Sequence, residues 1–204
     1  MLTESSIRSA GFTLLETMVT IGIFAILVML TVPAMGTWVT STRMRATADV
    51  LQNGVRLAQT ESLRRSRQVV FALTNDSPSA TNTAFTAAAT GKNWVVETIP
   101  AMTTGTEVTA FIASGALSSA NSTINIQGPA EVCFNSVGRL VVNTNANVPG
   151  GGAGCQLSAS ITYTYRITNG AATVPEYDVK LSLGGQMRLC DPNQTLSGSN
   201  PYGC

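Results

Sequence analysis

The hydropathy pattern opens with one long apolar run near the N-terminus. The 26 residues from Thr17 to Thr42 include no charged side chain, and most of them are large and aliphatic. At a rise of ~1.5 Å per residue, a helix of this length crosses a hydrocarbon core ~30 Å thick. The pattern therefore predicts an apolar helix over residues 12–36 that is long enough to span a membrane.

An amphipathic pattern follows the apolar run. Apolar or small residues recur at helical spacing, which marks one face of an α-helix: Met44, Ala48, Leu51, Val55, Ala58 and Ser62. The other face carries Arg43, Arg45, Asp49, Arg56 and Arg64. We therefore expect residues 37–67 to continue the helix, with the apolar face against a globular head. The arginine-rich face is interpreted as solvated, and contact with lipid headgroups or an acidic neighbouring subunit is the alternative.

Pro33 lies inside this long helical pattern. A proline in a helix removes one backbone hydrogen bond and kinks the helix. Because the helical pattern resumes at once after it, we expect a kink at Pro33. The alternative is that Pro33 ends the first helix.

After Ser66 the pattern changes to short β-branched or aromatic runs, separated by polar loops of small residues. The predicted strands are 68–74, 94–99, 108–113, 123–127, 132–134 with 139–142, 160–168 and 177–183. Residues 68–204 are therefore expected to form a β-rich globular head. An antiparallel sheet packed on the second half of one long helix defines the fold class as α+β.

Composition narrows the possible chemistry. Charged residues make up 11% of the chain, the formal net charge is +1, and there is no histidine. The lack of histidine removes Ser-His and Cys-His catalysis and imidazole metal sites. Glu176 and Asp178 alternate on one face of a predicted strand, but such a pair is more often a solvated edge than an acid–base pair. We therefore expect no enzyme, no cofactor and no metal site.

The chain has four cysteines, Cys133, Cys155, Cys190 and Cys204. None forms a C-x-x-C pair, which argues against a zinc or thioredoxin-like site. Behind an export segment, an even number of cysteines indicates disulfides in an oxidising compartment. Four cysteines allow three pairings. We favour Cys133–Cys155 and Cys190–Cys204, because each bond closes a local loop rich in Gly, Asn and Ser.

A specific motif opens the apolar run. Residues 1–11 form a short polar leader that ends in Gly11, and Phe12-Thr13-Leu14-Leu15-Glu16 follows at once. A lone carboxylate such as that of Glu16 costs about 2.5–3.5 kcal/mol inside an apolar segment and needs a partner. Over about the first 35 residues, the chain resembles the type IV pilins and the type II secretion pseudopilins.

The resemblance implies how the N-terminus is processed and used. A prepilin peptidase would cut between Gly11 and Phe12 and methylate the new amine of Phe12. The apolar helices of many subunits would then pack into a filament core. In that core the carboxylate of Glu16 would face the Phe12 amine of a neighbouring subunit. Each charge is costly alone in an apolar environment, so pairing relieves both.

The resemblance also implies a location and a set of partners. Before assembly the protein would span the bacterial inner membrane once, with its head in the periplasm; afterwards it would lie in a pilus or pseudopilus. The partners would be other major and minor pilins, the prepilin peptidase, the inner-membrane assembly platform, and the membrane itself through the N-terminal helix.

Two other interpretations of the N-terminus compete. One is a secretory signal peptide cut after Ala34-Met35-Gly36, although its apolar region would exceed the usual 7–15 residues. The other is a plain transmembrane anchor, in which Glu16 has no role. The first residue of the mature protein separates the three, because it would be Phe12 for a pilin and Thr37 for a signal peptide. A plain anchor would keep Met1 or begin at Leu2.

A second, shorter resemblance lies near the C-terminus. The segment from Leu183 to Cys190 resembles the closing strand of GspH/FimT-type minor pilins, some of which bind DNA through Gly-Arg-x-Arg. Here Gly185-Gln186-Met187-Arg188 lacks the first arginine, and from residue 68 onward five Lys and Arg stand against seven Asp and Glu. An acidic head with one arginine is a poor phosphate binder. We expect no nucleic-acid partner; Arg188 is the one weak candidate contact and is otherwise a solvent-facing strand residue.

These patterns together favour a minor pilin of a type IV pilus, incorporated into the tip complex or priming it. Because Glu16 is present, we expect a subunit stacked within that complex. The alternatives are a GspH-like pseudopilin of type II secretion and a DNA-binding minor pilin. A ligand-binding head that uses Trp94, Tyr163, Tyr165 or Tyr202 is a further possibility, although aromatic residues in strands are usually packing residues.

Overall fold

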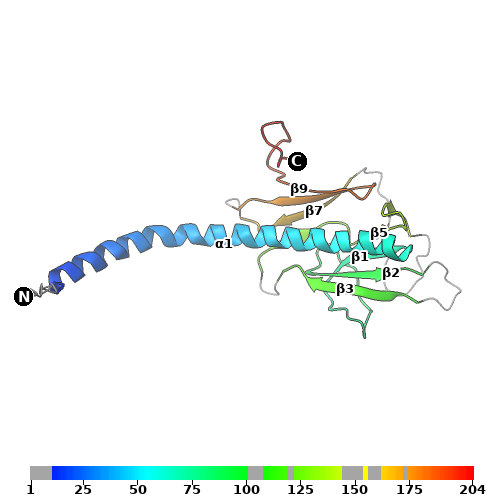
Figure 1. Ribbon diagram of the computed structural model, residues 1–204, viewed down its shortest axis with the longest axis horizontal. Helices are drawn as coiled ribbons and strands as arrows, with labels where there is room; N and C mark the ends of the chain where they lie inside the picture. The colour runs from blue at the N-terminus through cyan, green and yellow to red at the C-terminus, as the bar shows by residue number, and fades with distance from the viewer. Residues whose placement is uncertain (1–10, 101–107, 119–121, 144–153, 156–161, 172–173) are drawn as a thin grey trace, which may run out of the picture. The chain divides into compact units, whose positions relative to one another are not determined.

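One helix and nine strands make up the regular structure of the described residues in the computed structural model of this chain (Figure 1). The structure describes residues 11–100, 108–118, 122–143, 154–155, 162–171 and 174–204, and of residues 30–34 only the backbone. The chain divides into two units, Met1–Thr40 and Ser41–Cys204. The three consecutive glycines Gly150–Gly152 predict a flexible hairpin tip, but they lie outside the described residues.

Helix α1 runs from Leu14 to Arg65 and has a defined start. The hydroxyl of Thr13 accepts a hydrogen bond from the backbone N–H of Glu16 at 3.3 Å, which is half of a capping box. The helix continues through position 33, so Pro33 does not end it. The side chain of Pro33 lies outside the described part of the chain, and the kink there stays a prediction.

The end of α1 is closed by a Schellman motif. The N–H of Arg67 donates to the carbonyl of Ser62 at 3.2 Å, and the N–H of Ser66 donates to that of Leu63 at 3.3 Å. Ser66 takes the left-handed position with φ of 51°, which is usually a glycine position. The chain reverses here and enters the first strand.

The face of α1 predicted from the sequence is confirmed within the second unit. All six periodic residues are buried: Met44, Ala48, Leu51, Val55, Ala58 and Ser62. The five charged residues of the opposite pattern are exposed: Arg43, Arg45, Asp49, Arg56 and Arg64. Each buried CH₂ group contributes about 0.8 kcal/mol of hydrophobic free energy. This contribution explains why this half of the helix packs on the head.

The strands form two antiparallel sheets rather than the single sheet expected from the sequence. The first has the order β3-β2-β1-β5-β6 and the second β4-β7-β8-β9. The bounds are β1 Val69–Thr74, β2 Asn93–Thr98, β3 Ala110–Ala116, β4 Asn125–Gln127, β5 Glu131–Phe134, β6 Leu140–Val141, β7 Thr162–Thr168, β8 Tyr177–Ser182 and β9 Met187–Cys190. The α+β class is confirmed.

The sheets meet at a seam beside the helix. The N–H of Leu140 in β6 donates to the carbonyl of Leu183 after β8 at 3.1 Å. The side-chain amide of Gln59 on α1 donates to the carbonyl of Gly138 at 2.9 Å. Gly185 lies beside both, with φ of 84°, and a Cβ there would clash with the Gln59 amide and with the backbone carbonyl of Gly138. The glycine of the expected closing-strand motif is therefore required by the fold.

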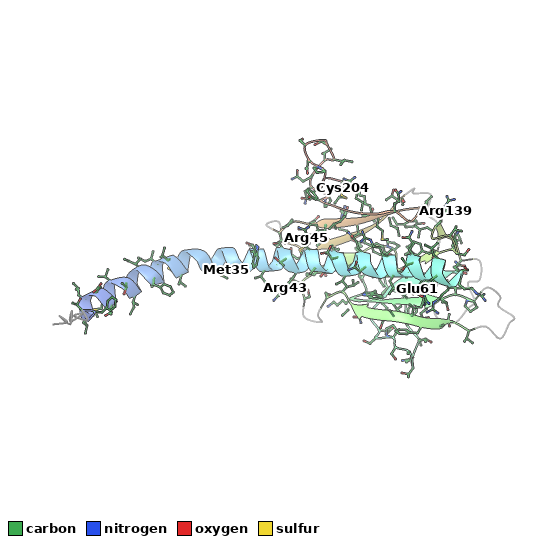
Figure 2. All side chains as sticks on the ribbon, viewed as in Figure 1. Met35, Arg43, Arg45, Glu61, Arg139 and Cys204 are labelled. Atoms are coloured by element: carbon green, nitrogen blue, oxygen red, sulfur yellow. A yellow bond between two sulfur atoms is a disulfide. The ribbon has the colours of Figure 1, made fainter. Side chains whose placement is uncertain are left out.

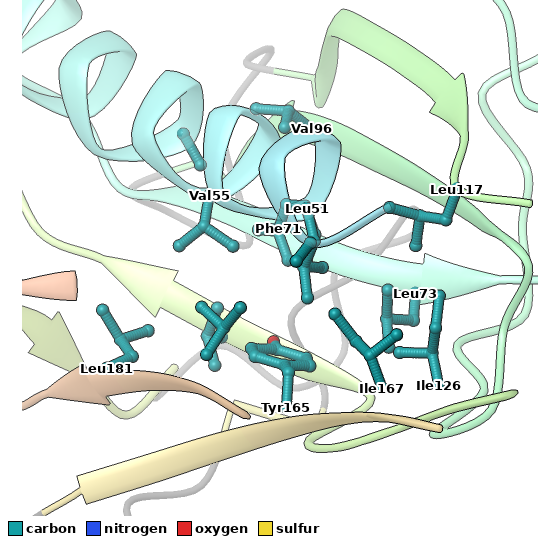
Figure 3. Close-up of a cluster of buried hydrophobic side chains, with 14 of the residues drawn as sticks. Leu51, Val55, Phe71, Leu73, Val96, Leu117, Ile126, Tyr165, Ile167 and Leu181 are labelled. Carbon is teal, nitrogen blue, oxygen red and sulfur yellow. The ribbon is translucent and has the colours of Figure 1, made fainter. Parts of the chain in front are cut away.

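The main core lies between α1 and the two sheets (Figure 3). Leu51 and Val55 of the helix meet Phe71 of the first sheet and Tyr165 of the second, and all four are 0–1% exposed. The Phe71 and Tyr165 rings make an edge contact with centroids 6.1 Å apart. Aromatic pairs of this kind stabilise a core beyond their area alone.

Two glycines make room for Trp94 in this core. A Cβ on Gly54 of α1 would lie 2.9 Å from the Phe71 ring and 3.2 Å from the indole of Trp94. A Cβ on Gly115 of β3 would lie 2.9 Å from the indole nitrogen. The sequence predicted that β3 ends at Ala113, but the strand continues to Ala116 because Gly115 fits against Trp94, with which it pairs in register.

A smaller cluster covers the opposite face of the first sheet. It contains Val70, Ala72, Val95, Ile99, Cys133 and Cys155, with Phe85 and Phe111 packed against it. The Cys133–Cys155 disulfide ties residue 155 to β5, and a second disulfide joins Cys190 to Cys204. The favoured pairing of the four cysteines is therefore confirmed.

Candidate functional site

The first unit presents an apolar helical surface. Twelve large apolar side chains between residues 12 and 29 are 38–80% exposed: Phe12, Leu14, Leu15, Met18, Val19, Ile21, Ile23, Phe24, Ile26, Leu27, Val28 and Met29. Monomeric soluble proteins rarely expose a contiguous apolar patch larger than a few hundred Å². This segment is therefore a surface suited to association with another apolar surface.

The hydroxyl groups in this segment do not interrupt its apolar character. Thr17 donates its hydroxyl hydrogen to the carbonyl of Leu14 at 2.8 Å, and Thr20 donates to the carbonyl of Thr17 at 3.0 Å. Hydroxyls bonded to their own helix backbone need no other partner in an apolar environment. The ordinary cost of bringing threonine into such an environment is thereby lowered.

Glu16 is the one charged residue among the described residues of this unit. Its carboxylate is exposed and forms no hydrogen bond or ion pair with another described residue. It lies in the first turn of α1, where a negative charge is stabilised by the helix dipole. The carboxylate is therefore held near the helix start and is available to a cation from another molecule.

Gly11 and Phe12 lie just before Thr13, the residue that caps the start of α1. A Cβ on Gly11 would meet no atom within 4 Å, and its φ lies outside the left-handed region. The fold of this chain therefore does not require glycine at position 11. Phe12 is 80% exposed, so its backbone and ring are both accessible.

The structure gives a separate finding on membrane insertion. Among the described residues, no helix combines the length and the apolar character needed to cross a membrane. The expected span, residues 12–36, includes residues 30–34, whose side chains lie outside the described part of the chain. Membrane insertion of this segment stays a prediction.

Arg188, the candidate DNA contact, is used within the chain. Its guanidinium donates to the carbonyl of Pro201 at 2.9 Å and to that of Gly203 at 2.8 Å. These bonds tie β9 to the C-terminal tail. A guanidinium already bound to two carbonyls has fewer donors left for a phosphate.

The carboxylates considered for acid–base chemistry are not a free pair. Asp178 is 2% exposed overall and accepts two hydrogen bonds from Arg166, at 3.0 and 3.1 Å, directly across β7 and β8. Burial with a bidentate partner is typical of a structural ion pair. Glu176 precedes β8 and is partly buried.

The four aromatic candidates for ligand binding have different roles. Tyr165 is fully buried and Trp94 packs against the core, so both are packing residues. Tyr163 also packs against the core cluster. Tyr202 differs, because its side chain is 74% exposed on the C-terminal tail.

Comparison with protein families identifies the N-terminal segment. Residues 7–32 match the family model described as the prokaryotic N-terminal methylation motif. The match spans the expected cleavage position, Phe12 and Glu16, together with most of the exposed apolar surface. The chain therefore carries a prokaryotic N-terminal methylation motif, the signal type found in type IV pilins.

Comparison with solved structures finds two crystal forms of one protein, the type IV minor pilin FimU of Pseudomonas aeruginosa strain PAO1. The first is 14% identical, with a TM-score of 0.47, and the match covers 74% of this chain and 93% of that one. The second is also 14% identical, with a TM-score of 0.44, covering 72% and 96%. No curated protein sequence matches this chain.

Proposed function

We propose that this chain is a minor subunit of a type IV pilus, made as a prepilin and incorporated through its N-terminal helix. The observation that carries the proposal is the coincidence of the methylation motif with the exposed apolar surface. A motif of this kind marks residues for processing, and the same residues expose the surface that an assembly would bury. We propose that the subunit lies within the tip complex or primes it.

Processing after Gly11 would create the second charge of the assembly site. Cleavage between Gly11 and Phe12 leaves an ammonium group on Phe12, and methylation keeps that charge. Gly11 has open space around it, so glycine there serves the close approach of a peptidase to the backbone rather than the fold. The new ammonium and the Glu16 carboxylate then stand four residues apart on one helix end.

The two charges would set the axial position of each subunit relative to its neighbours in the filament. We infer that in a filament the partner of the Glu16 carboxylate is the Phe12 ammonium of a neighbouring subunit. Removing one member of a buried pair typically costs 3–5 kcal/mol, because the other charge is left alone. A subunit out of register would bury both charges unpaired and would be rejected.

Two alternatives share parts of this account. A pseudopilin of type II secretion would use the same N-terminus and the same charge pair, and scoring piliation, twitching and secretion separately in a deletion strain distinguishes the two. DNA binding has less support, because Arg188 is bound to the tail carbonyls.

A Glu16→Gln variant tests the proposal. Glutamine keeps a polar side chain of the same size in the capping position but removes the charge. We expect export and cleavage as in the wild type, and a drop of at least about tenfold in the amount recovered in sheared filaments, since 1.4 kcal/mol already corresponds to tenfold.

The matched control is Asp49→Asn, which removes an exposed carboxylate from the same helix within the head. It should be incorporated as in the wild type. Normal recovery of the Glu16→Gln subunit in filaments would contradict the proposed charge pair.

A further inference from the structure

A cleft lies between α1, the start of β8, the end of β9 and the C-terminal tail. Its volume is about 450 Å³, and its lining includes Arg45, Pro175, Tyr177, Leu189, Asp191 and Tyr202. Small-molecule sites typically have volumes of ~300–1,000 Å³ and apolar or aromatic walls with a few polar groups. The cleft lies entirely within the second unit and is separate from the N-terminal assembly surface.

The wall that carries Tyr202 is fixed before any ligand arrives. The Cys190–Cys204 disulfide closes the tail, and the N–H of Asp191 donates to the carbonyl of Tyr202 at 2.7 Å. Arg188 holds the carbonyls on both sides of Tyr202, those of Pro201 and Gly203. An exposed ring on a fixed backbone loses little freedom on binding, which favours affinity.

The cleft has polar groups of both charges that a ligand can contact. Arg45 is exposed, and it forms no ion pair or hydrogen bond with another described residue. Asp191 uses one carboxylate oxygen to accept the N–H of Asn193 at 2.9 Å. The hydroxyls of Tyr177 and Tyr202 form no hydrogen bond with another described residue. The cleft therefore offers donors, acceptors and aromatic faces together.

This combination selects the chemistry of the ligand. Arg45 and Asp191 give this lining one charge of each sign, so it has no net attraction for a strongly anionic or a strongly cationic ligand. A purely apolar ligand would desolvate both charges without replacing their hydrogen bonds. A neutral ligand with apolar C–H faces and many hydroxyls satisfies all of these groups. Saccharides have this character.

We propose that this cleft is a binding site for a neutral oligosaccharide. Tyr177 and Tyr202 present their rings to sugar faces, Arg45 donates to hydroxyl oxygens, and Asp191 accepts from hydroxyl hydrogens. The inference does not depend on filament assembly, because every residue involved belongs to the head.

The test is a titration of the purified full-length protein with chitotriose, maltotriose and lactose, using 3′-sialyllactose as the anionic comparison. The protein is kept in a zwitterionic detergent that contains no sugar, because a maltoside headgroup would compete. Binding is followed by ligand-observed NMR and calorimetry. We expect at least one neutral sugar to bind with a Kd between about 0.1 and 1 mM, and sialyllactose to bind less tightly.

Matched variants assign the binding to the cleft. Tyr202→Ala and Arg45→Ala should each weaken binding by about tenfold, since each removes a contact worth on the order of 1.4 kcal/mol. Leu196→Ala is the control on the same tail, where Leu196 is exposed but does not line the cleft. Arg43→Ala is the control on α1, since Arg43 lies on the opposite side of the helix from Arg45 (Figure 2).

Three results would overturn the proposal. One is that no neutral sugar binds the wild type with a Kd below about 10 mM, which is tenfold weaker than a complex with a Kd of 1 mM. Another is that Tyr202→Ala and Arg45→Ala bind like the controls. The third is that Arg45→Ala abolishes association with other subunits while no sugar binds, which assigns the cleft to a protein contact instead. Loss of filament incorporation through Glu16 changes none of these readouts.

Discussion

Glu97 is the most unusual single residue of the head. It lies in β2 between Val95 and Ile99 of the smaller cluster and is 0% exposed, and neither of its carboxylate oxygens has a hydrogen-bond partner among the described residues. Burial raises its pKa to about 7, because the apolar surroundings disfavour the charged form. A carboxylate in this position makes the stability of the head depend on pH.

The direction of that dependence follows from the pKa shift. The unfolded chain loses the proton near its usual pKa of 4.5, whereas the folded chain keeps it until about pH 7. Stability therefore falls as pH rises from about 4.5 to about 7 and stays lower above that range. We expect the wild type to lose on the order of 2–3 kcal/mol of unfolding free energy between pH 5 and pH 8 through this group.

Urea denaturation of wild type and Glu97→Gln at pH 5 and pH 8 measures this effect. The glutamine cannot ionise, so the free energy of unfolding of the variant should rise relative to that of the wild type as the pH rises. A variant that keeps the full pH dependence of the wild type would show that another group causes it.

At the scale of elements, helix α1 was the most predictable part of the fold. Its buried face follows from the periodicity of residues such as Leu51 and Val55, because a helix places positions three and four apart on one side. Most strands were also predictable from β-branched runs. The division into two sheets was not, because which strands pair depends on contacts between distant segments, such as Leu140 with Leu183.

The packing of Trp94 is the element-scale feature that sequence patterns missed. A glycine inside a helix normally weakens it by about 1 kcal/mol, so Gly54 gave no hint of a structural role. In the structure it allows α1 to approach the Phe71 and Trp94 rings, whose centroids are 6.2 Å apart. The role becomes visible only when the helix and the first sheet are placed together.

A Gly54→Val variant tests this contact. The new side chain would clash with the Phe71 ring, so we expect the head to lose about 1–3 kcal/mol of unfolding free energy. Gly198→Val is the matched control, because a Cβ there meets no atom within 4 Å, and it should be neutral within about 0.5 kcal/mol. Equal stability of the two variants would mean that the helix does not need glycine to pack on the rings.

At the scale of the whole molecule, the two candidate sites differ in how far the sequence defines them. The N-terminal site was predictable, because Gly11, Phe12 and Glu16 are close in sequence around the start of α1. The cleft was not, because Arg45 and Tyr202 meet only after the head has folded and the tail has been closed by its disulfide.

The two units differ in which side chains they expose, and this difference fits different roles. The described residues of the first unit expose apolar side chains and one carboxylate, which suits the association with other copies of this helix that we propose. The second buries its apolar residues between a helix and two sheets and keeps the charges of α1 outside (Figure 2). The head can therefore vary its loops and clefts without changing the surface that we propose for assembly.

The intact mass and N-terminal sequence of the protein recovered from sheared filaments show directly whether a chain processed after Gly11 is assembled. We expect a chain that begins at Phe12, carries a methyl group on its amine, and retains both disulfides. A chain that keeps residues 1–11 in the assembled material, or a soluble periplasmic protein that begins at Thr37, would contradict it.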